Sequence, residues 1–449
     1  MINPKIRLKE YENKKKRLIK EFLSKDEVRL GKNTSNLFRH RKETNSTINV
    51  RDFNKVIHVD TNNLIIEVEG MTTYEELVKE SLKYNVMPTV VPELKTITIG
   101  GAVTGVGIES SSFKYGLVHE TILEMEILLG DGSTVTCTPK NKHKDLFFAF
   151  PNSYGTLGYA LKLKVKAVPV KKYVELTHIK FDNPNEYFKK VKEFCEKTKE
   201  FDLIDGSIFN EKEMYITLGK FIDTAPFVSD YTYMKIYFKS IQDKKKDYLT
   251  ISDYIWRWDT DWFWCSKHFF VRKPLIRLIF GRRLLNSKTY WKIRVWNGKY
   301  KFAEKIGKLF GASKTESIVQ DVEFPIENCK KFINFFHKEI GIKPIWICPV
   351  KVYDKKVNYD LFQMNKNKLY VNFGFWDMVK TKYEDGHYNR KIEKKVSELK
   401  GHKSLYSTVY YSKNEFDQIY NKKRYSLIKK KYDPNSKFKS LYEKCVEKR

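Results

Sequence analysis

Several features are scarce or missing in this 449-residue sequence, and each absence excludes a class of protein. The chain has no run of 18 or more apolar residues, so no transmembrane helix is predicted. Residues 1–22 lack the apolar stretch of a signal peptide and instead predict a charged helix. The six cysteines are scattered and form no C-x-x-C pair, which argues against a zinc site or a disulfide framework. We therefore expect a cytoplasmic protein with reduced thiols and no bound metal.

Acidic residues are few relative to basic ones. The chain has 85 Lys and Arg against 55 Asp and Glu, which gives a formal net charge of +30. Such a charge attracts nucleic acids, anionic membranes or anionic substrates. An AT-rich genome would also enrich Lys, Asn, Ile and Tyr, and this compositional cause competes with a functional one. No segment resembles a nucleic-acid-binding module, so we expect no nucleic-acid partner.

One segment, residues 256–301, concentrates both basic and aromatic side chains. It holds 12 Lys and Arg against Asp259 and Asp261, together with six of the eight tryptophans. Tryptophan rings and cations suit the boundary between an anionic membrane and water. Pro274 and Gly281 favour a short interfacial helix over a membrane span. We expect peripheral membrane association here; the alternative is an aromatic core segment with a solvated basic face.

Glycine is scarce overall but concentrated at residues 98–116, TIGGAVTGVGIESSSFKYG, which contain five glycines. Glycines let a ligand approach the main chain closely, and exposed amides in such a loop form a cradle for phosphate oxygens. Ser110 breaks the Rossmann G-x-G-x-x-G pattern, and no G-K-[ST] ending of a Walker loop occurs. Together with Asp131-Gly132 and a second glycine pair in 155–158, the stretch predicts a large anionic cofactor. The alternative is a tight loop that packs two sheets together.

The segments around this stretch show strand and helix patterns. Residues 56–60, 64–69 and 161–168 predict strands, and residues 72–84 predict a helix capped by Thr72 or Thr73. Residues 122–129 and 134–137 predict a hairpin around Asp131-Gly132. Beyond residue 170 the pattern is mixed, with predicted strands at 173–179 and 213–218 and predicted helices at 185–197 and 326–339.

Short motifs in a fixed order resemble a known flavoprotein domain. In chain order they are Val68-Glu69-Gly70, Pro92-Glu93-Leu94, Ile99-Gly100-Gly101, Asp131-Gly132, Asp145-Leu146-Phe147 and Gly155-Thr156-Leu157-Gly158. This order resembles the FAD-binding domain of the vanillyl-alcohol-oxidase superfamily, the PCMH type. Segments 107–117, 169–176, 319–321 and 344–349 are similar to its Δ24-sterol reductase branch. Segment 256–266, WRWDTDWFWCS, is more similar to bacterial relatives associated with reduction of methylene-branched fatty acyl chains.

The resemblance implies an α+β fold, in which a PCMH-type FAD-binding domain of two subdomains carries an α+β cap over the flavin. We expect the FAD-binding domain at 1–170 and the cap at 171–403, with an aromatic and basic insertion at 241–303. We expect residues 404–449 to form a C-terminal helical segment that returns to the FAD-binding domain. Residues 29–36 occupy the place of the family's pyrophosphate loop and contain no histidine, so the resemblance implies non-covalent FAD.

The residues expected to hold FAD come from three loops. The first supplies hydroxyls and amides for phosphate, the second contacts the pyrophosphate and the flavin, and the third supports the flavin from the other side. They are Gly31, Lys32, Asn33, Thr34, Ser35 and Asn36; Thr98, Gly100, Gly101, Thr104, Gly105, Gly107, Ile108, Glu109, Ser110, Ser111 and Gly116; and Gly155, Thr156 and Gly158.

The resemblance further implies reduction of a lipid C=C bond of the Δ24-sterol type. Hydride would pass from NADPH to flavin N5 and on to a substrate carbon, while an acid within hydrogen-bond reach protonates the neighbouring carbon. The candidate acids are Glu109, Tyr115 and His119 beside the flavin loop, and Tyr370, Asn372 and His387 from the cap. Each of them also has a structural interpretation, as a loop ligand, a core histidine or a strand residue.

Three other functions remain open at this point. The same chemistry would serve a methylene-branched or unsaturated fatty acyl chain as lipid partner. The fold also hosts flavin oxidases and dehydrogenases of alcohols or sugars, because fold alone does not decide function. A fourth hypothesis is a flavin-binding scaffold without turnover.

Overall fold

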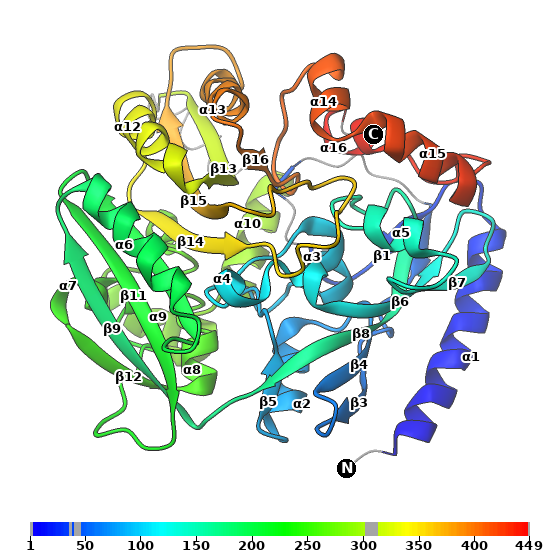
Figure 1. The fold of residues 1–449 in the computed structure, drawn as a ribbon, viewed down its shortest axis with the longest axis horizontal. Helices are drawn as coiled ribbons and strands as arrows, with labels where there is room; N and C mark the ends of the chain where they lie inside the picture. The colour runs from blue at the N-terminus through cyan, green and yellow to red at the C-terminus, as the bar shows by residue number, and fades with distance from the viewer. Residues whose placement is uncertain (1–2, 36–37, 40–45, 301–312, 448–449) are drawn as a thin grey trace.

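The structure is a computed structural model that describes residues 3–35, 38–39, 46–300 and 313–447, with only the backbone at 298–300. Most of its strands form two large sheets that lie side by side, and β8 of the first sheet leads directly into β9 of the second (Figure 1). Asn36, one of the residues expected to bind the cofactor, lies outside the described residues.

The first sheet has the order β3-β4-β8-β6-β7, with β5 added beside β8, and its pairings are antiparallel. The strands are β3 (Val56–Asp60), β4 (Ile65–Glu69), β5 (Val86–Pro88), β6 (Ile122–Leu128), β7 (Thr134–Cys137) and β8 (Tyr159–Pro169). The predicted hairpin forms around Asp131-Gly132, where Gly132 has φ +85°. Helix α2 (Tyr74–Leu82) packs against β3 and β5, and Thr73 caps this helix, as predicted.

A smaller unit packs on the edge of this sheet. Helix α1 (Pro4–Leu23) contacts the parallel pair β1 (Arg29–Gly31) and β2 (Thr47–Asn49), and its position is shown in blue in Figure 1. Buried Tyr11 meets Phe53 edge to face, and Phe22 packs against Phe438 from the far end of the chain. The predicted charged N-terminal helix is thereby confirmed as α1.

The second sheet is antiparallel and has the order β12-β9-β11-β10-β14-β15-β13-β16. Its strands are β9 (Tyr173–Phe181), β10 (Leu203–Asn210), β11 (Glu213–Ile222), β12 (Lys246–Thr250), β13 (Thr315–Pro325), β14 (Ile345–Lys351), β15 (Leu369–Lys380) and β16 (His402–Lys403). Helices α6 (Pro184–Glu196), α12 (Cys329–Glu339) and α13 (His387–Glu398) share a buried apolar cluster with these strands. A second cluster joins residues of both sheets, such as Val165 of β8 and Trp346 of β14, so the two halves pack directly against each other.

The aromatic and basic segment divides into a buried part and an exposed part. It follows α7 (Tyr237–Asp243) and the edge strand β12, and continues as α8 (Ile251–Ile255), η2 (Cys265–Phe269), α9 (Pro274–Leu284) and α10 (Ser287–Tyr300). Trp258 and Trp264 are fully buried, whereas Leu275, Leu278 and Ile279 of α9 are exposed. The core alternative therefore describes the part around Trp258 and Trp264, while membrane association through α9 stays a prediction. Gly281 interrupts α9, as predicted.

The C-terminal residues form α14 (Lys413–Ile419), α15 (Lys422–Tyr432) and α16 (Leu441–Cys445), drawn in red in Figure 1. Helix α15 contacts α5 (Lys144–Ala149), where the Tyr432 hydroxyl donates to Asp145 at 2.7 Å. Lys429 donates to the carbonyl of Thr156 at 2.9 Å. These contacts join α15 to the first half of the molecule, while the domain boundaries at 170 and 403 stay predictions.

The α+β fold class is confirmed by the mixed helices and antiparallel sheets. Within the ranges that the structure describes, no helix has both the length and the apolarity needed to cross a bilayer.

Candidate cofactor and substrate site

A cavity of about 570 Å³ lies between the two halves of the molecule. This volume falls within the usual range of small-molecule sites. Its walls come from segments that are far apart in the chain: residues within 27–35, 38–39, 46–47, 92–109, 154–160, 262–265, 319–321, 404–406 and 437–444, with Met71, Arg294, Trp346 and Trp376. Side chains from both sheets and from the aromatic segment therefore converge on one space.

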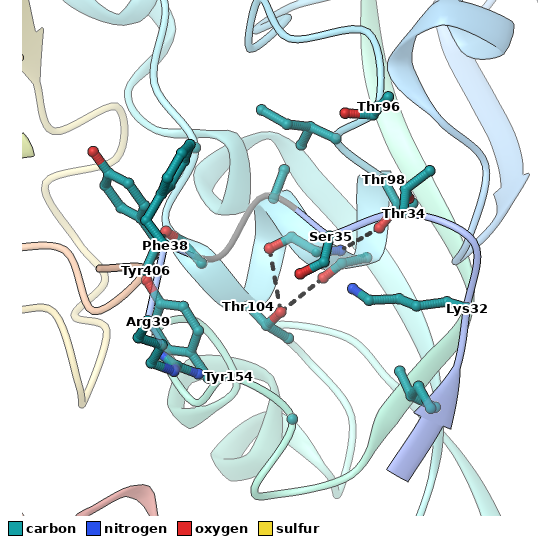
Figure 2. A pocket seen from close by; sticks show the side chains of 18 of the residues that line it. Lys32, Thr34, Ser35, Phe38, Arg39, Thr96, Thr98, Thr104, Tyr154 and Tyr406 are labelled. Carbon is teal, nitrogen blue, oxygen red and sulfur yellow. Dashed lines mark hydrogen bonds between the residues drawn. The ribbon is translucent and has the colours of Figure 1, made fainter. Parts of the chain in front are cut away.

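The lining residues fall into two chemically different groups. One group is basic and includes Arg29 and Lys32 from the first loop, Lys437, Lys439 and Lys444 from the C-terminal segment, and Arg39 and Arg294. The other combines carboxyl groups with aromatic rings: Glu93, Glu109, Asp321, Trp262, Phe263, Trp346 and Trp376. Figure 2 shows Lys32 and Thr34 on one side of Thr104, and Phe38, Arg39 and Tyr406 on the other. The cavity thus offers cations for an anionic group and an apolar, acid-bearing section for a flat ring or a lipid.

The glycine-rich stretch forms a short helix, α3 (Ile99–Gly105), where the sequence predicted an open loop. Thr98 caps this helix by accepting from the Gly101 amide at 3.2 Å, and the Gly100 amide donates to the carbonyl of Gly70 at 2.9 Å. The Thr104 hydroxyl donates to the carbonyl of Gly100 at 3.0 Å (Figure 2). These two amides are therefore paired inside the protein, and α3 contributes its glycine surface and its threonine side chains to the wall.

Glycine is required at two of these positions for different reasons. A Cβ atom at Gly100 would stand 2.7 Å from the carbonyl oxygen of Gly70, so only glycine lets α3 approach β4 this closely. Gly158 has φ +129°, which other residues rarely adopt, and it turns the chain into β8 beside the cavity.

Most of the residues expected to hold the cofactor line this cavity. They are Lys32, Thr34, Ser35, Thr98, Gly100, Gly101, Thr104, Gly105, Gly107, Ile108, Glu109, Gly155 and Gly158. Six described residues of the prediction stand outside the lining: Gly31, Asn33, Ser110, Ser111, Gly116 and Thr156. Ser110 shares a hydrogen bond with the Tyr254 hydroxyl, and Ser111 donates to the carbonyl of Thr89, so both support the loop from behind.

Of the six candidate acids, Glu109 faces the cavity and the other five lie outside its lining. Tyr115 packs beside Tyr353, and the Tyr370 hydroxyl accepts from the Asn365 amide. His119 is buried against Tyr359, and burial lowers its pKa to about 3. His387 stacks on Tyr383 at the start of α13. Asn372 does not line the cavity either, but its side-chain amide donates a hydrogen bond to Asp321, which does.

Glu109 belongs to a buried ionic cluster around Arg257. The guanidinium group donates to Glu109 at 2.9 Å and to Asp205 at 2.8 Å, and Glu93 lies 3.6 Å from it. Burial raises the pKa of Glu109 and raises that of Glu93 well above its ordinary value, whereas the Arg257 charge opposes both shifts. One guanidinium shared by three buried carboxyl groups favours retention of a proton in this cluster.

Asp321 is a second cavity carboxyl group, and sequence reasoning assigned it no role. It lies on β13 and accepts from Asn372 at 2.7 Å and from the Tyr406 hydroxyl at 2.8 Å. Tyr406 in turn accepts from the Trp376 indole at 2.9 Å. Burial raises the pKa of Asp321 to about 6. The sequence did contain a signal for Asp321, because an acidic residue lies within the apolar strand pattern SIVQDVEF. Buried carboxyl groups are rare unless they are paired or functional.

Comparison with known proteins assigns the cofactor. Residues 25–138 match the FAD binding domain family. The chain is 28% identical to the human Δ24-sterol reductase over 423 residues, which cover 90% of this chain and 78% of the relative. The Δ24-sterol reductase of Arabidopsis thaliana is 22% identical, with coverage of 90% and 77%. Cytokinin dehydrogenase 1 of the same plant is 24% identical over 143 residues, 32% of this chain and 25% of the relative.

The residues present in the cavity fit FAD. The matched range contains the first loop and α3, which supply Lys32, Thr34, Ser35, Thr98 and Thr104 to the wall. Basic side chains suit the pyrophosphate, and the glycine surface of α3 suits close approach of a flat ring. The prediction of a PCMH-type, FAD-dependent oxidoreductase similar to Δ24-sterol reductases is confirmed.

Proposed function

We propose that this FAD-dependent oxidoreductase, which resembles Δ24-sterol reductases along nine-tenths of its length, reduces a carbon–carbon double bond in a lipid. The observation that carries the proposal is that the loops expected to hold the cofactor and an aromatic wall line the same cavity beside α3. Trp346, Trp376 and Phe263 form that wall, with ring centroids 4.8 to 6.4 Å apart. A sterol side chain is the proposed substrate, because the relatives with the longest matches carry that activity in their names.

The chain's own residues have defined tasks in this proposal. FAD, when bound, supplies the capacity to accept and donate hydride. Lys32, Thr34 and Ser35 would hold its phosphates, and the aromatic wall would exclude water and hold an apolar chain. The carboxyl groups of the same section would supply a proton to an otherwise unreactive double bond.

The electron donor in this proposal is NADPH, on the strength of the likeness to Δ24-sterol reductases. The cofactor would be held without a covalent bond, because no histidine occurs among the lining residues in the part of the chain that is described. Acid precipitation of the flavoprotein should leave the yellow colour in the supernatant. Colour that stays with the pellet would contradict non-covalent binding.

We also propose that residues 256–301 bring the enzyme to an anionic membrane. Leu275, Leu278 and Ile279 of α9 are 67%, 60% and 71% exposed, and their spacing places them on one helical face. Lys273, Arg282 and Arg283 flank this face. The same segment supplies Trp262, Cys265 and Arg294 to the cavity wall, so the exposed apolar face and the lipid site belong to one stretch of chain.

Vesicle binding tests this contact. The double variant Leu278→Ser with Ile279→Ser should reduce co-sedimentation with vesicles of phosphatidylcholine and phosphatidylglycerol at least tenfold, because two large apolar side chains leave the interface. Leu427→Ser, at an equally exposed position on α15, is the matched control and should bind as the wild type does. Equal binding by wild type and double variant would contradict the proposed surface.

Two alternative substrates have specific support. The segment WRWDTDWFWCS favours a methylene-branched fatty acyl chain, and its buried Trp258 and Trp264 stand behind the cavity wall. An oxidation instead of a reduction draws support from cytokinin dehydrogenase 1, a dehydrogenase by name, whose match covers only 32% of this chain. The fatty acyl alternative keeps the reduction and changes only the lipid, whereas an oxidation reverses the direction of electron flow.

Anaerobic spectroscopy separates these functions. NADPH should bleach the bound flavin, and a Δ24-unsaturated sterol should restore its absorbance, with the saturated sterol as a non-reacting control. Restoration by a methylene-branched phospholipid alone would reassign the substrate. Bleaching by an alcohol in place of NADPH would favour an oxidase. A flavin that responds to neither NADPH nor an alcohol would favour a flavin-binding scaffold without turnover.

A further inference from the structure

Asp321 occupies a distinctive place in the cavity wall. It is one of four carboxyl side chains in the lining, with Glu27, Glu93 and Glu109. Glu27 pairs with Lys439, and Glu93 and Glu109 share Arg257. In the described part of the chain, the partners of Asp321 are instead two neutral donors, the Asn372 amide and the Tyr406 hydroxyl. A proton on this carboxyl group therefore does not compete with a neighbouring cation.

The groups around Asp321 keep it in one orientation. Asn372 on the adjacent strand β15 donates to one carboxyl oxygen, and Tyr406 donates to the other. The Trp376 indole donates to the Tyr406 oxygen, which fixes the direction of the tyrosine hydroxyl. Each carboxyl oxygen has two acceptor positions, so one position on each stays available on the cavity side.

The titratable groups that face Asp321 are Glu323 on the same strand, Cys348 on β14 and Tyr406. Burial raises the pKa of all three well above their ordinary values. Arg294 of α10 interacts electrostatically with Tyr406. Burial raises the pKa of Asp321 itself to about 6.

We propose that Asp321 is the acid that protonates the lipid double bond, and that Asn372 and Tyr406 are its positioning residues. This inference rests on the proposed function. The carboxyl proton forms a bond to one carbon as the π bond breaks, and the other carbon receives the hydride that the NADPH-reduced enzyme supplies. The product gains two hydrogens, and the remaining Asp321 carboxylate keeps its two hydrogen bonds until solvent reprotonates it.

Asp321→Asn tests the inference, because the amide keeps the shape of the carboxyl group and one acceptor oxygen but cannot donate a proton of this acidity. NADPH should still bleach the flavin of this variant at the wild-type rate. Reoxidation by the lipid should slow by about 10²-fold or more, the usual contribution of a general acid. Glu323→Gln is the matched control, since Glu323 is buried on the same strand and face but does not line the cavity. It should change neither half-reaction more than a few-fold.

A spectroscopic readout is independent of turnover. An infrared titration of the flavoprotein should show a carboxylic acid C=O band that disappears with a midpoint near pH 6 and is missing in Asp321→Asn. Tyr406→Phe removes one donor to the carboxylate, so the midpoint should rise by about one unit. An unshifted midpoint in Tyr406→Phe, or an unchanged band in Asp321→Asn, would overturn the assignment.

Failure of the inference is distinguishable from failure of the proposed function. If no lipid reoxidises the wild-type flavin, the proposed function fails and the acid role falls with it. If lipid reoxidises both wild type and Asp321→Asn at equal rates, the function stands and the assignment of Asp321 is wrong. Loss of lipid reoxidation in Glu109→Gln but not in Asp321→Asn would give the role to Glu109.

Discussion

Arg257 joins three parts of the chain through buried charges. Its guanidinium group contacts Glu93 and Glu109 from the cofactor half and Asp205 from the second sheet, while Arg257 itself belongs to the aromatic segment. Trp346 adds a hydrogen bond to Asp205 at 3.2 Å. Removal of one partner of a buried ionic group leaves uncompensated charges, which is costly even where the intact group contributes little.

The first prediction at the residue scale concerns this cluster. Arg257→Met should lower the free energy of unfolding by about 3 to 5 kcal/mol, because three buried carboxyl groups lose their cation. Urea unfolding measures the change. Arg17→Met is the control: its pair with Asp52 is about half exposed on both sides, so the loss should stay below about 1 kcal/mol. Similar losses in the two variants would contradict the account.

A second prediction follows from the pKa of Asp321. In the folded chain burial raises this pKa to about 6, from an ordinary value of 3.8, so the folded state holds the proton more tightly than the unfolded state. Its contribution to stability is full below pH 3.8 and is lost as the pH rises through 6. Relative to wild type, Asp321→Asn should therefore gain stability between pH 4 and pH 7, by about 3 kcal/mol at most. A constant difference across this range would show that Asp321 does not titrate there.

Sequence reasoning found many of the residues that line the cavity but gave Asp321 no role. Gly100, Gly101 and Thr104 belong to a contiguous motif, so the pattern alone places them at the cavity. Asp321, Tyr406 and Trp376 come together through the pairing of β13 with β15 and through the loop after β16, and no local pattern encodes that meeting. Tyr115 and His119 are close to the glycine-rich stretch in sequence, but neither lines the cavity, because tertiary packing places them against Tyr353 and Tyr359.

At the scale of the element, helix α3 shows why glycine is needed at position 100 and not at position 105. The helix lies so close to the turn after β4 that position 100 has no room for a side chain, whereas a Cβ at Gly105 would meet only the Tyr154 ring at 3.6 Å. Gly100→Ala should therefore destabilise the protein by about 1 to 3 kcal/mol through overpacking. Gly105→Ala should be neutral or stabilising, since alanine favours a helix. Thermal unfolding compares them, and equal melting temperatures would contradict this explanation.

Elements with strong local signals were predictable, and elements that depend on tertiary contacts were not. The hairpin around Asp131-Gly132 and the caps of α2 follow from short-range chemistry and are confirmed. Helix α3 was missed because glycine has low helix propensity; Thr98 as cap and the contact with Gly70 outweigh that cost. The aromatic segment was ambiguous because tryptophans suit a core and a membrane boundary equally, and burial alone separates Trp264 from α9.

At the scale of the whole molecule, the cofactor cavity is also the seam between its halves. Residues of β13, β14 and β15 form one wall, and α3 with the loop before β8 forms the other. A ligand that fills this seam binds the folded state and not the unfolded chain. FAD at about one hundred times its dissociation constant should stabilise the deflavinated protein by about 2.7 kcal/mol. A melting temperature that does not depend on FAD concentration would place the cofactor elsewhere.

The central claim is that the reduced flavoprotein transfers two hydrogens to a lipid double bond. A single turnover under anaerobic conditions tests it most directly, with NADPH-reduced enzyme mixed with a Δ24-unsaturated sterol and the lipid analysed by mass spectrometry. We expect one saturated sterol, heavier by two hydrogens, for each flavin that is reoxidised. Flavin that stays reduced, or that reoxidises while the sterol keeps its mass, would contradict the account.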